Sequence, residues 1–262
     1  MSGTERTPAF SGRYPFSLEM QVRGFDCDGR GLLRAGCALR YLQEAAGGHL
    51  ESLGLGYQRL FEEGVFFVLT GQAFRVLRPP HRGERLTAAT GPIAPAGGVR
   101  MFRETVLIGE DGALCAESQS AWALLDVATG RPLRPSRFGH RLPLLGGEWK
   151  PFADPAHLRI PEPQQPCGER EVRASDLDVN RHMNNAVYAD LALDCFPDEL
   201  LGSGGVGELR ICYRRQARLG EHIALRRDRQ GAWFLAGGSV DGQPCFSAEF
   251  SLIPLATDAD RC

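Results

Sequence analysis

The stretch VRASDLD at residues 172–178 echoes the stretch VRGFDCD at residues 22–28. Only the later copy continues into VNRHMNN at residues 179–185. Because the later copy alone carries Asp-x-Asn-x-His, we expect two similar folds that share a single reactive site. Repeats decide the architecture of a chain, so this echo is the first feature to interpret.

Two shorter matches follow in the same order along the chain. A Gly-Glu step at residues 83–84 recurs at 220–221. An Asp-Gly pair at residues 111–112, with a cysteine three residues beyond it, recurs at 241–242. The repeating unit is longer than a solenoid repeat, so the matches predict a duplicated domain.

Composition places the chain among ordinary globular proteins. Its 262 residues are 43% hydrophobic and 24% charged, which suits one large or two small domains. The net charge of −2 indicates neither nucleic acid nor membrane as a partner. The eight cysteines form no C-x-x-C pair and the start of the chain is polar, so we expect reduced thiols and a cytoplasmic location. No apolar run approaches the roughly 18 residues of a membrane helix.

Hydrophobic periodicity predicts the same order of elements in both halves. Apolar residues spaced by three and four predict helices at residues 37–53 and 184–196. Alternating or β-branched runs predict strands. In the first half these are residues 16–25, 65–77, 86–90, 100–108 and 114–125. In the second half one strand ends at Val172, and the others are residues 208–214, 223–227, 233–240 and 244–253.

Each half therefore places one helix against one curled antiparallel sheet, which is an α+β fold. The proline-rich stretch 129–166 is interpreted as a connection that wraps the surface, with a short structured piece near residues 142–145. We expect an N-terminal domain at residues 1–140, a linker at 141–166 and a C-terminal domain at 167–262.

Asp178, Asn180 and His182 alternate immediately before the second predicted helix. In an extended segment such side chains point the same way. Asn184 or Asn185 can cap the helix, whose first N–H groups and dipole favour a developing oxyanion. These groups could together activate a water and stabilise a tetrahedral intermediate.

Two other interpretations of this motif remain open. Asp and Asn are common in loops, where they satisfy backbone groups and tolerate unusual dihedral angles. Asp176, Asp178 and His182 could also bind a metal, but no second cluster of His or Cys supports that, and we expect neither metal nor cofactor.

The stretch SDLDVNRHMNNAVYADLALDCFP at residues 175–197 resembles the signature of the acyl-acyl carrier protein thioesterases, the double hotdog enzymes of plants and bacteria. Weaker resemblances keep the family's order over nearly the whole chain. They are YLQEAAGGHL (41–50), GVFFVLTGQAFRVLRPPHRGE (64–84), SAWALLDVATGRPLRP (120–135) and ELRICYRRQARLGE (208–221). The resemblance implies two tandem hotdog domains, each an antiparallel sheet wrapped around a long helix. It also implies hydrolysis of fatty acyl thioesters on acyl carrier protein, which releases free fatty acid.

By position, Asp178, Asn180 and His182 match the family's catalytic residues. The family usually continues with Tyr-Arg-Arg-Glu-Cys, where this chain has Gln216 and Ala217 in the last two places. Alanine excludes a thiol nucleophile there, and glutamine can hold water or substrate but cannot accept a proton as a carboxylate does. We expect Asp178 or His182 to act as general base, with Asn180 orienting the pair and Gln216 binding water or thioester.

In the first half, Arg30 and Leu32 stand where Asn180 and His182 would be. The resemblance gives that half the acyl-chain tunnel, with Leu42, Phe67 and Leu69 as candidate lining residues, together with Ala46, Leu50, Phe66 and Val68. Each of these, taken singly, could equally be a core residue. His49 is interpreted as an ordinary surface or core histidine.

The substrate's head group is expected to meet Asn184, Asn185, Arg214 and Arg215. Arginines near the site could steer an acidic carrier protein or the phosphates of coenzyme A, and the sequence does not choose between them. Alternatives are an acyl-coenzyme A thioesterase, a dehydratase-like enzyme, or a non-catalytic protein that binds or senses acyl thioesters. The dehydratase pattern has a proline after the Asn, which is missing here. We expect a monomer or a homodimer.

Overall fold

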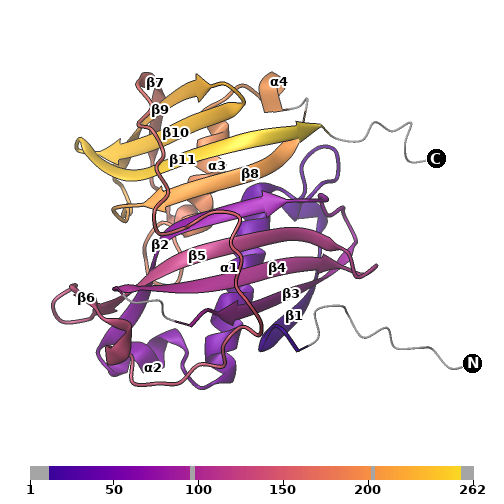
Figure 1. Cartoon of the computed structure of the whole chain (residues 1–262). Coiled ribbons are helices and arrows are strands. Elements are labelled where there is room, and N and C mark those ends of the chain that lie inside the picture. The colour runs from indigo at the N-terminus through magenta and orange to yellow at the C-terminus, as the bar shows by residue number, and fades with distance from the viewer. Residues whose placement is uncertain (1–11, 95–97, 202–203, 255–262) are drawn as a thin grey trace, which may run out of the picture.

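The computed structural model describes residues 12–94, 98–201 and 204–254. The chain forms one continuous sheet in the order β1-β3-β4-β5-β2-β8-β11-β10-β9-β7, with the short β6 paired to β5 (Figure 1). The first half supplies β1 (Phe16–Gln21), β2 (Val65–Val76), β3 (Arg85–Pro92), β4 (Arg100–Gly109), β5 (Leu114–Asp126) and β6 (Pro132–Leu133). The second half supplies β7 (Gln165–Glu171), β8 (Gly204–Tyr213), β9 (His222–Gln230), β10 (Trp233–Val240) and β11 (Gln243–Pro254).

Two helices carry the central packing. They are α1 (Ala35–Ser52) and α3 (Asn185–Asp194), which lie behind the sheet and contact each other (Figure 1). A side-chain Cβ at Gly36 would lie 2.0 Å from the carboxylate of Asp190, so only glycine permits this approach of the two helices. Arg40 of α1 adds an ion pair to Asp190 at 2.9 Å. No helix of the described residues is both long and apolar enough to cross a bilayer.

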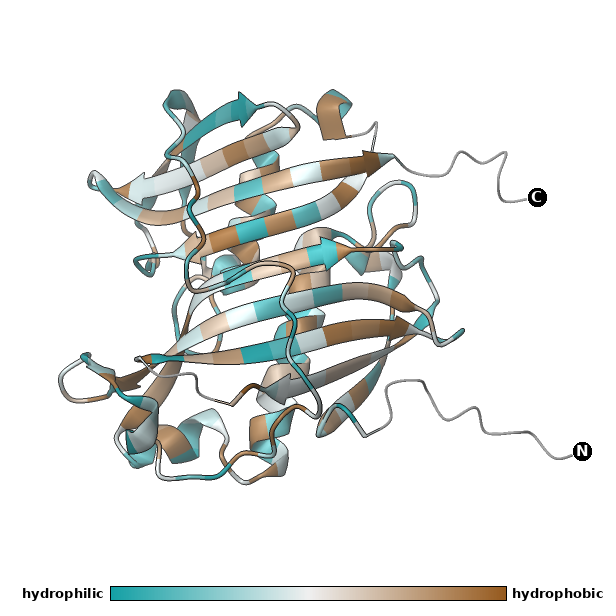
Figure 2. Cartoon of the chain, viewed as in Figure 1, coloured by the Kyte–Doolittle hydropathy of each residue, from teal (hydrophilic) through white to brown (hydrophobic). Residues whose placement is uncertain are grey.

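The two halves join edge to edge through β2 and β8, which pair antiparallel from Gly71 opposite Cys212 to Arg75 opposite Glu208. The connection between the halves crosses the outer face of the sheet (Figure 1), where a Cβ at Gly71 would lie 2.2 Å from the carbonyl oxygen of Pro155. Hydrophobic and hydrophilic residues alternate along many strands (Figure 2), as expected where one face meets helices and the other does not.

The repeat noticed in the sequence has a clear structural meaning. Glu84 and Glu221, the acidic residues of the two Gly-Glu steps, each receive a bidentate hydrogen bond from an arginine six residues earlier. Each glutamate's backbone carbonyl also accepts the N–H of the valine that begins the matching stretch, Val22 or Val172, at 2.9 Å. The two halves therefore use the same turn to hold the segment that leads into the helix, which confirms the predicted α+β duplication.

The predicted helices and strands are present, with shifted ends. The helix expected at residues 184–196 is only 10 residues long, and Pro197 follows soon after its end. A short helix, α2 (Tyr57–Glu62), and the four-residue α4 (Asp198–Leu201) were not predicted. The structured piece expected near residues 142–145 is wrong, since that stretch has neither helix nor strand. The boundaries 1–140, 141–166 and 167–262 stay a prediction.

Candidate active site

The Asp-x-Asn-x-His motif forms a tight loop between β7 and α3. The loop closes where the N–H of Asp178 donates to the carbonyl of His182 at 2.9 Å. Inside it the carboxylate of Asp178 accepts the N–H of Asn180 at 2.8 Å, and Arg181 takes the left-handed conformation with φ of 63°. The loop interpretation of these residues is thus correct for the backbone. A structural role in the loop still allows Asp178 a chemical role, because only one of its carboxylate oxygens is bonded within the turn.

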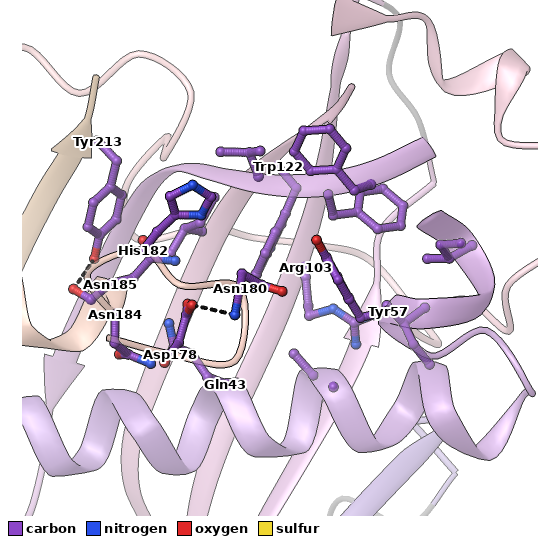
Figure 3. A pocket seen from close by; sticks show the side chains of 18 of the residues that line it. Gln43, Tyr57, Arg103, Trp122, Asp178, Asn180, His182, Asn184, Asn185 and Tyr213 are labelled. Carbon is purple, nitrogen blue, oxygen red and sulfur yellow. Dashed lines mark hydrogen bonds between the residues drawn. The ribbon is translucent and has the colours of Figure 1, made fainter. Parts of the chain in front are cut away.

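The start of α3 lies directly after this loop. Of the two predicted candidates, Asn184 is the cap, and its side-chain oxygen accepts the N–H of Ala186 at 2.9 Å. Asn185 is the first helical residue, and its carbonyl accepts the hydroxyl of Tyr213 at 3.3 Å (Figure 3). The N–H of Asn185 has no partner in the described part of the chain, so it is available to a ligand.

A cavity of about 410 Å³ opens beside the loop and is shared by both halves. The second half contributes predicted polar residues, namely Asp178, Asn180, His182, Asn184, Asn185, Arg214, Arg215 and Gln216. The first half contributes apolar residues that were also predicted, namely Ala46, Leu50, Phe66, Phe67, Val68 and Leu69. The cavity thus joins a polar end to an apolar wall, although the two sets come from different halves of the chain.

Leu42 does not line this cavity, so the structure does not bring it together with the other predicted substrate-binding residues. Its side chain is 2% exposed and belongs to the main hydrophobic core. Residues of a helix are set about 100° apart. Gln43, Ala46 and Leu50 therefore face the cavity while Leu42 turns toward the sheet.

The side-chain oxygen of Asn180 is buried and unsatisfied. Its Oδ1 has no hydrogen-bond partner among the described residues. Unpaired buried acceptors are rare because they cost free energy, and they often mark a position where a ligand or water binds. The oxygen lies on the wall of the cavity, next to Asp178 and opposite helix α1 (Figure 3).

Gln216 is held in place by the peptide of its neighbour Ala217, which is fully buried. The carbonyl of Ala217 accepts the N–H of Met183 at 3.1 Å, and its N–H donates to the hydroxyl of Tyr188 at 3.0 Å. Burial raises the pKa of Tyr188, so this hydroxyl stays protonated. The segment carrying Gln216 is therefore fixed to both the loop and α3.

The first half has the same loop with different chemistry. Asp28 accepts the N–H of Arg30 at 2.9 Å and forms an ion pair with its guanidinium at 2.7 Å. Partial burial opposes ionisation of Asp28, but the bonds from Arg30 and Leu32 hold its pKa below the ordinary value. Pro80 accepts the N–H of Leu33 as Ala217 accepts that of Met183, so Pro79 occupies the place of Gln216. This copy therefore has neither the imidazole nor the amides.

Metal binding finds no support in the geometry. Asp176, which that interpretation required, accepts hydrogen bonds from Arg170 at 2.8 Å and from the N–H of Arg173 at 2.7 Å. The described residues contain no group of three or more His, Cys, Asp or Glu side chains that could hold a metal ion. The seven described cysteines are free thiols, and none lines the cavity.

Several cavity residues were not predicted from the sequence. They are Gln43, Tyr57, Met101, Phe102, Arg103, Trp122, Leu142, Tyr188 and Tyr213, among others (Figure 3). Tyr188 and Tyr213 lie close in sequence to the motif and to Gln216, so proximity could have suggested them. The residues of β4 and β5 had no such signal.

Two family models match most of this chain. Residues 13–135 match the acyl-ACP thioesterase N-terminal domain and residues 163–234 match the acyl-ACP thioesterase C-terminal domain. A chloroplastic palmitoyl-acyl carrier protein thioesterase of Gossypium hirsutum is 25% identical over 220 residues, which cover 77% of this chain and 52% of the relative. An acyl-[acyl-carrier-protein] hydrolase of Cuphea viscosissima is 27% identical over 199 residues, or 68% of this chain and 45% of the relative. The chain thus spans about half the length of the curated relatives it matches.

Two solved structures show the same fold over nearly their whole length. An acyl-ACP thioesterase from Bacteroides thetaiotaomicron superimposes with a TM-score of 0.82 at 22% identity, covering 90% of this chain and 97% of that one. The 12:0-ACP thioesterase from Umbellularia californica gives 0.74 at 18% identity, with 92% and 97% covered. These similarities confirm the predicted tandem hotdog fold.

Proposed function

Because the chain belongs to the acyl-ACP thioesterase family, we propose that it hydrolyses fatty acyl thioesters, first of all those on acyl carrier protein, and releases free fatty acid. The observation that carries this proposal is the placement of Asp178, Asn180, His182 and Gln216 on one wall of a cavity whose other wall is mostly apolar. A thioester seated there has its carbonyl beside groups that can activate water and its chain beside hydrocarbon.

In the proposed reaction, Asp178 or His182 takes a proton from a water whose oxygen attacks the thioester carbonyl carbon. Asn180 and Gln216 hold that water and the substrate, using the side-chain oxygen of Asn180 that has no described partner. The free N–H of Asn185 and the start of α3 stabilise the negative oxygen of the tetrahedral intermediate. The C–S bond then breaks, the thiolate takes up the proton, and the acid leaves as a carboxylate.

The apolar wall supports a fatty acyl chain as the bound group. Each methylene moved from water into such a wall contributes about 0.8 kcal/mol. Phe66, Phe67, Leu69 and Leu50 line this part of the cavity. Removal of a long chain from water therefore favours fatty substrates over short polar ones.

The arginines at the cavity favour an anionic carrier, but unequally. Arg215 is bound to both carboxylate oxygens of Glu221 at 2.9 and 2.6 Å, so its charge is largely compensated. Arg214 is exposed and its side chain pairs with no carboxylate of the described residues. We propose Arg214 as the residue that meets the acidic carrier protein, or the phosphates of coenzyme A if that is the carrier.

A hydrolysis assay across acyl chain lengths, on both acyl carrier protein and coenzyme A, tests the proposal through release of free thiol. Preferential turnover on carrier protein supports it, and preferential turnover on coenzyme A identifies the alternative thioesterase. Gln216 and Ala217 favour a second candidate, a protein that binds acyl thioesters without cleaving them. Measurable binding with no thiol released from any substrate would identify that function.

We further propose a cytoplasmic location and a monomer or homodimer. The free thiols of the described cysteines fit a reducing compartment. The pairing of β2 with β8 already joins two hotdog units within one chain, which makes a monomer sufficient for a complete site. Size-exclusion chromatography with light scattering measures the oligomeric state.

A further inference from the structure

The cavity contains a buried cation that the proposed reaction does not use. Arg103 lies on β4, is 7% exposed, and lines the cavity. In Figure 3 it lies between Asn180 and Tyr57, farther along α1 than the loop. Arg103 forms no ion pair within the described part of the chain, and burial lowers its pKa only to about 10. Its charge is therefore present at neutral pH and uncompensated, which is costly in a protein interior.

The hydrogen bonds around Arg103 leave an excess of donors. Its Nη1 donates to Nδ1 of His49 at 3.2 Å and to the hydroxyl of Thr90 at 3.1 Å, while Nε and Nη2 have no described partner. Burial, and then the charge of Arg103, lower the pKa of His49 to about 4, so its ring is neutral. Because Nδ1 accepts, Nε2 carries the proton, and that buried N–H is also unpaired.

Among the residues that the structure describes, no neighbouring side chain supplies the missing acceptor. The carboxylate of Glu104 is bound to Arg13 at 2.9 Å and to the hydroxyl of Tyr14 at 2.8 Å, and successive residues of a strand point to opposite faces. Phe16 stacks on the ring of His49 at 5.6 Å. A plain hydrocarbon chain would offer no acceptor either, and it would shut water away from the guanidinium.

We propose that Arg103, whose Nη1 is bonded to the buried His49, forms a polar subsite within the acyl cavity that binds an oxygen atom carried on the acyl chain. The chemical class is an oxygen-bearing acyl thioester, with a hydroxyl, keto or carboxylate oxygen that accepts an N–H from the free side of the guanidinium. A carboxylate forms the strongest such bond because it also compensates the charge. The expected effect of the subsite on hydrolysis rates rests on the proposed thioesterase function. The expected effect on the binding of acyl chains does not.

A positional scan tests this subsite. Hydroxyacyl-pantetheine thioesters of one chain length, with the hydroxyl moved stepwise along the chain, are compared with the unsubstituted thioester. In the wild-type protein we expect kcat/KM to peak at one hydroxyl position, roughly tenfold to hundredfold above the unsubstituted chain. Thioesters with a keto or a carboxylate group at that position then show which of the three oxygen-bearing groups the subsite prefers. A flat profile in the wild type overturns the proposal.

The matched variants are Arg103→Met and Arg75→Met. Methionine keeps an unbranched apolar stem and removes the charged guanidinium without stranding a partner carboxylate, so Arg103→Met should unfold at a temperature no lower than the wild type and give a flat profile. Arg75 of β2 pairs with Glu117 and does not line the cavity, so its replacement should keep the peak. A peak that survives in Arg103→Met contradicts the subsite. If Arg103→Met does not fold, Arg103→Gln takes its place in the comparison, since glutamine removes the charge but keeps a neutral donor.

Calorimetry with non-hydrolysable amide analogues of the same acyl pantetheines separates the subsite from catalysis. Tighter binding of the oxygen-bearing amide by the wild type, lost in Arg103→Met, supports the subsite even if no thioester is cleaved. Equal binding of plain and oxygen-bearing amides overturns it, including when hydrolysis is observed and the thioesterase proposal stands.

Discussion

Asp28 and Asp178 occupy equivalent turns, and each accepts the backbone N–H of the residue two positions later, at 2.9 and 2.8 Å. Only their surroundings differ. Asp28 is paired with Arg30, whereas Asp178 lines the cavity beside Asn180 and His182. The chain thus contains its own control for the catalytic role of one carboxylate.

Replacing Asp178 by Asn should lower kcat/KM for a long-chain acyl thioester at least about a hundredfold, because the amide cannot act as a base. The Asp28→Asn variant should stay within about twofold of the wild type. In both variants the amide oxygen can still accept the backbone N–H, so thermal unfolding should show folded proteins. Equal activity of Asp178→Asn and the wild type would remove Asp178 from the mechanism and leave His182 as the base.

The Gln216→Glu variant should increase turnover by roughly tenfold, since a carboxylate at this position can accept a proton as well as hold water. Gln43 of α1 lines the same cavity, so Gln43→Glu introduces the same charge at a different place and should give no gain. Steady-state kinetics on one substrate compare the two. A matching increase in both variants would point to a general effect of negative charge rather than to chemistry at residue 216.

Tyr188→Phe should lower kcat about tenfold with little change in KM, because the N–H of Ala217 loses its acceptor and Gln216 is no longer held in place. Tyr213→Phe is the comparison. Its hydroxyl also meets the backbone of the site, at the carbonyl of Asn185, but at 3.3 Å and away from Gln216. If the two variants lose kcat equally, Tyr188 has no specific positioning role.

Glu84→Gln should destabilise the protein by about 1–3 kcal/mol at pH 7, since the glutamate is 3% exposed and bonded to Arg78. Burial opposes its ionisation, but the bonds from Arg78 and from the N–H of His81 outweigh it and hold its pKa below the ordinary value of 4.5. A lowered pKa stabilises the folded state above the unfolded value, and this contribution is lost as the pH falls through the folded pKa. Denaturant unfolding from pH 7 to pH 3 should therefore show the difference from wild type shrinking in acid. Glu221→Gln, at a more exposed copy of the same pair, should lose less.

The repeat could be recognised from the sequence because its residues perform the same local task twice. Val22 and Val172 bond to the backbone carbonyls of Glu84 and Glu221. The carboxylates of these glutamates each bind an arginine six residues earlier, and this side-chain pairing permits few other residue types. Asp178, Asn180 and His182 were recognisable for a related reason, since their loop mixes backbone and side-chain constraints within a few residues. Local chemistry of this kind is visible in a one-dimensional pattern.

Other parts of the site depend on contacts that the sequence pattern does not contain. Helix α1 is apolar on two neighbouring faces, because one meets the sheet and the other meets the cavity, so Leu42 and Ala46 could not be told apart. Arg103 and Glu104 are adjacent and both buried, and only the packing of β4 between β3 and β5 decides which one faces the cavity. The short α2 has too few turns to produce a periodic signal.

The edge-to-edge pairing of β2 with β8 also has a genetic consequence. In an assembly of two identical chains, any substitution in the reactive loop appears in both copies at once. Here each loop is encoded separately, so Arg30, Leu32 and Pro79 can occupy one copy while Asn180, His182 and Gln216 occupy the other. Substitutions in the first half and in the second half can therefore alter the cavity independently. A substitution in one loop does not also have to be tolerated in the other loop.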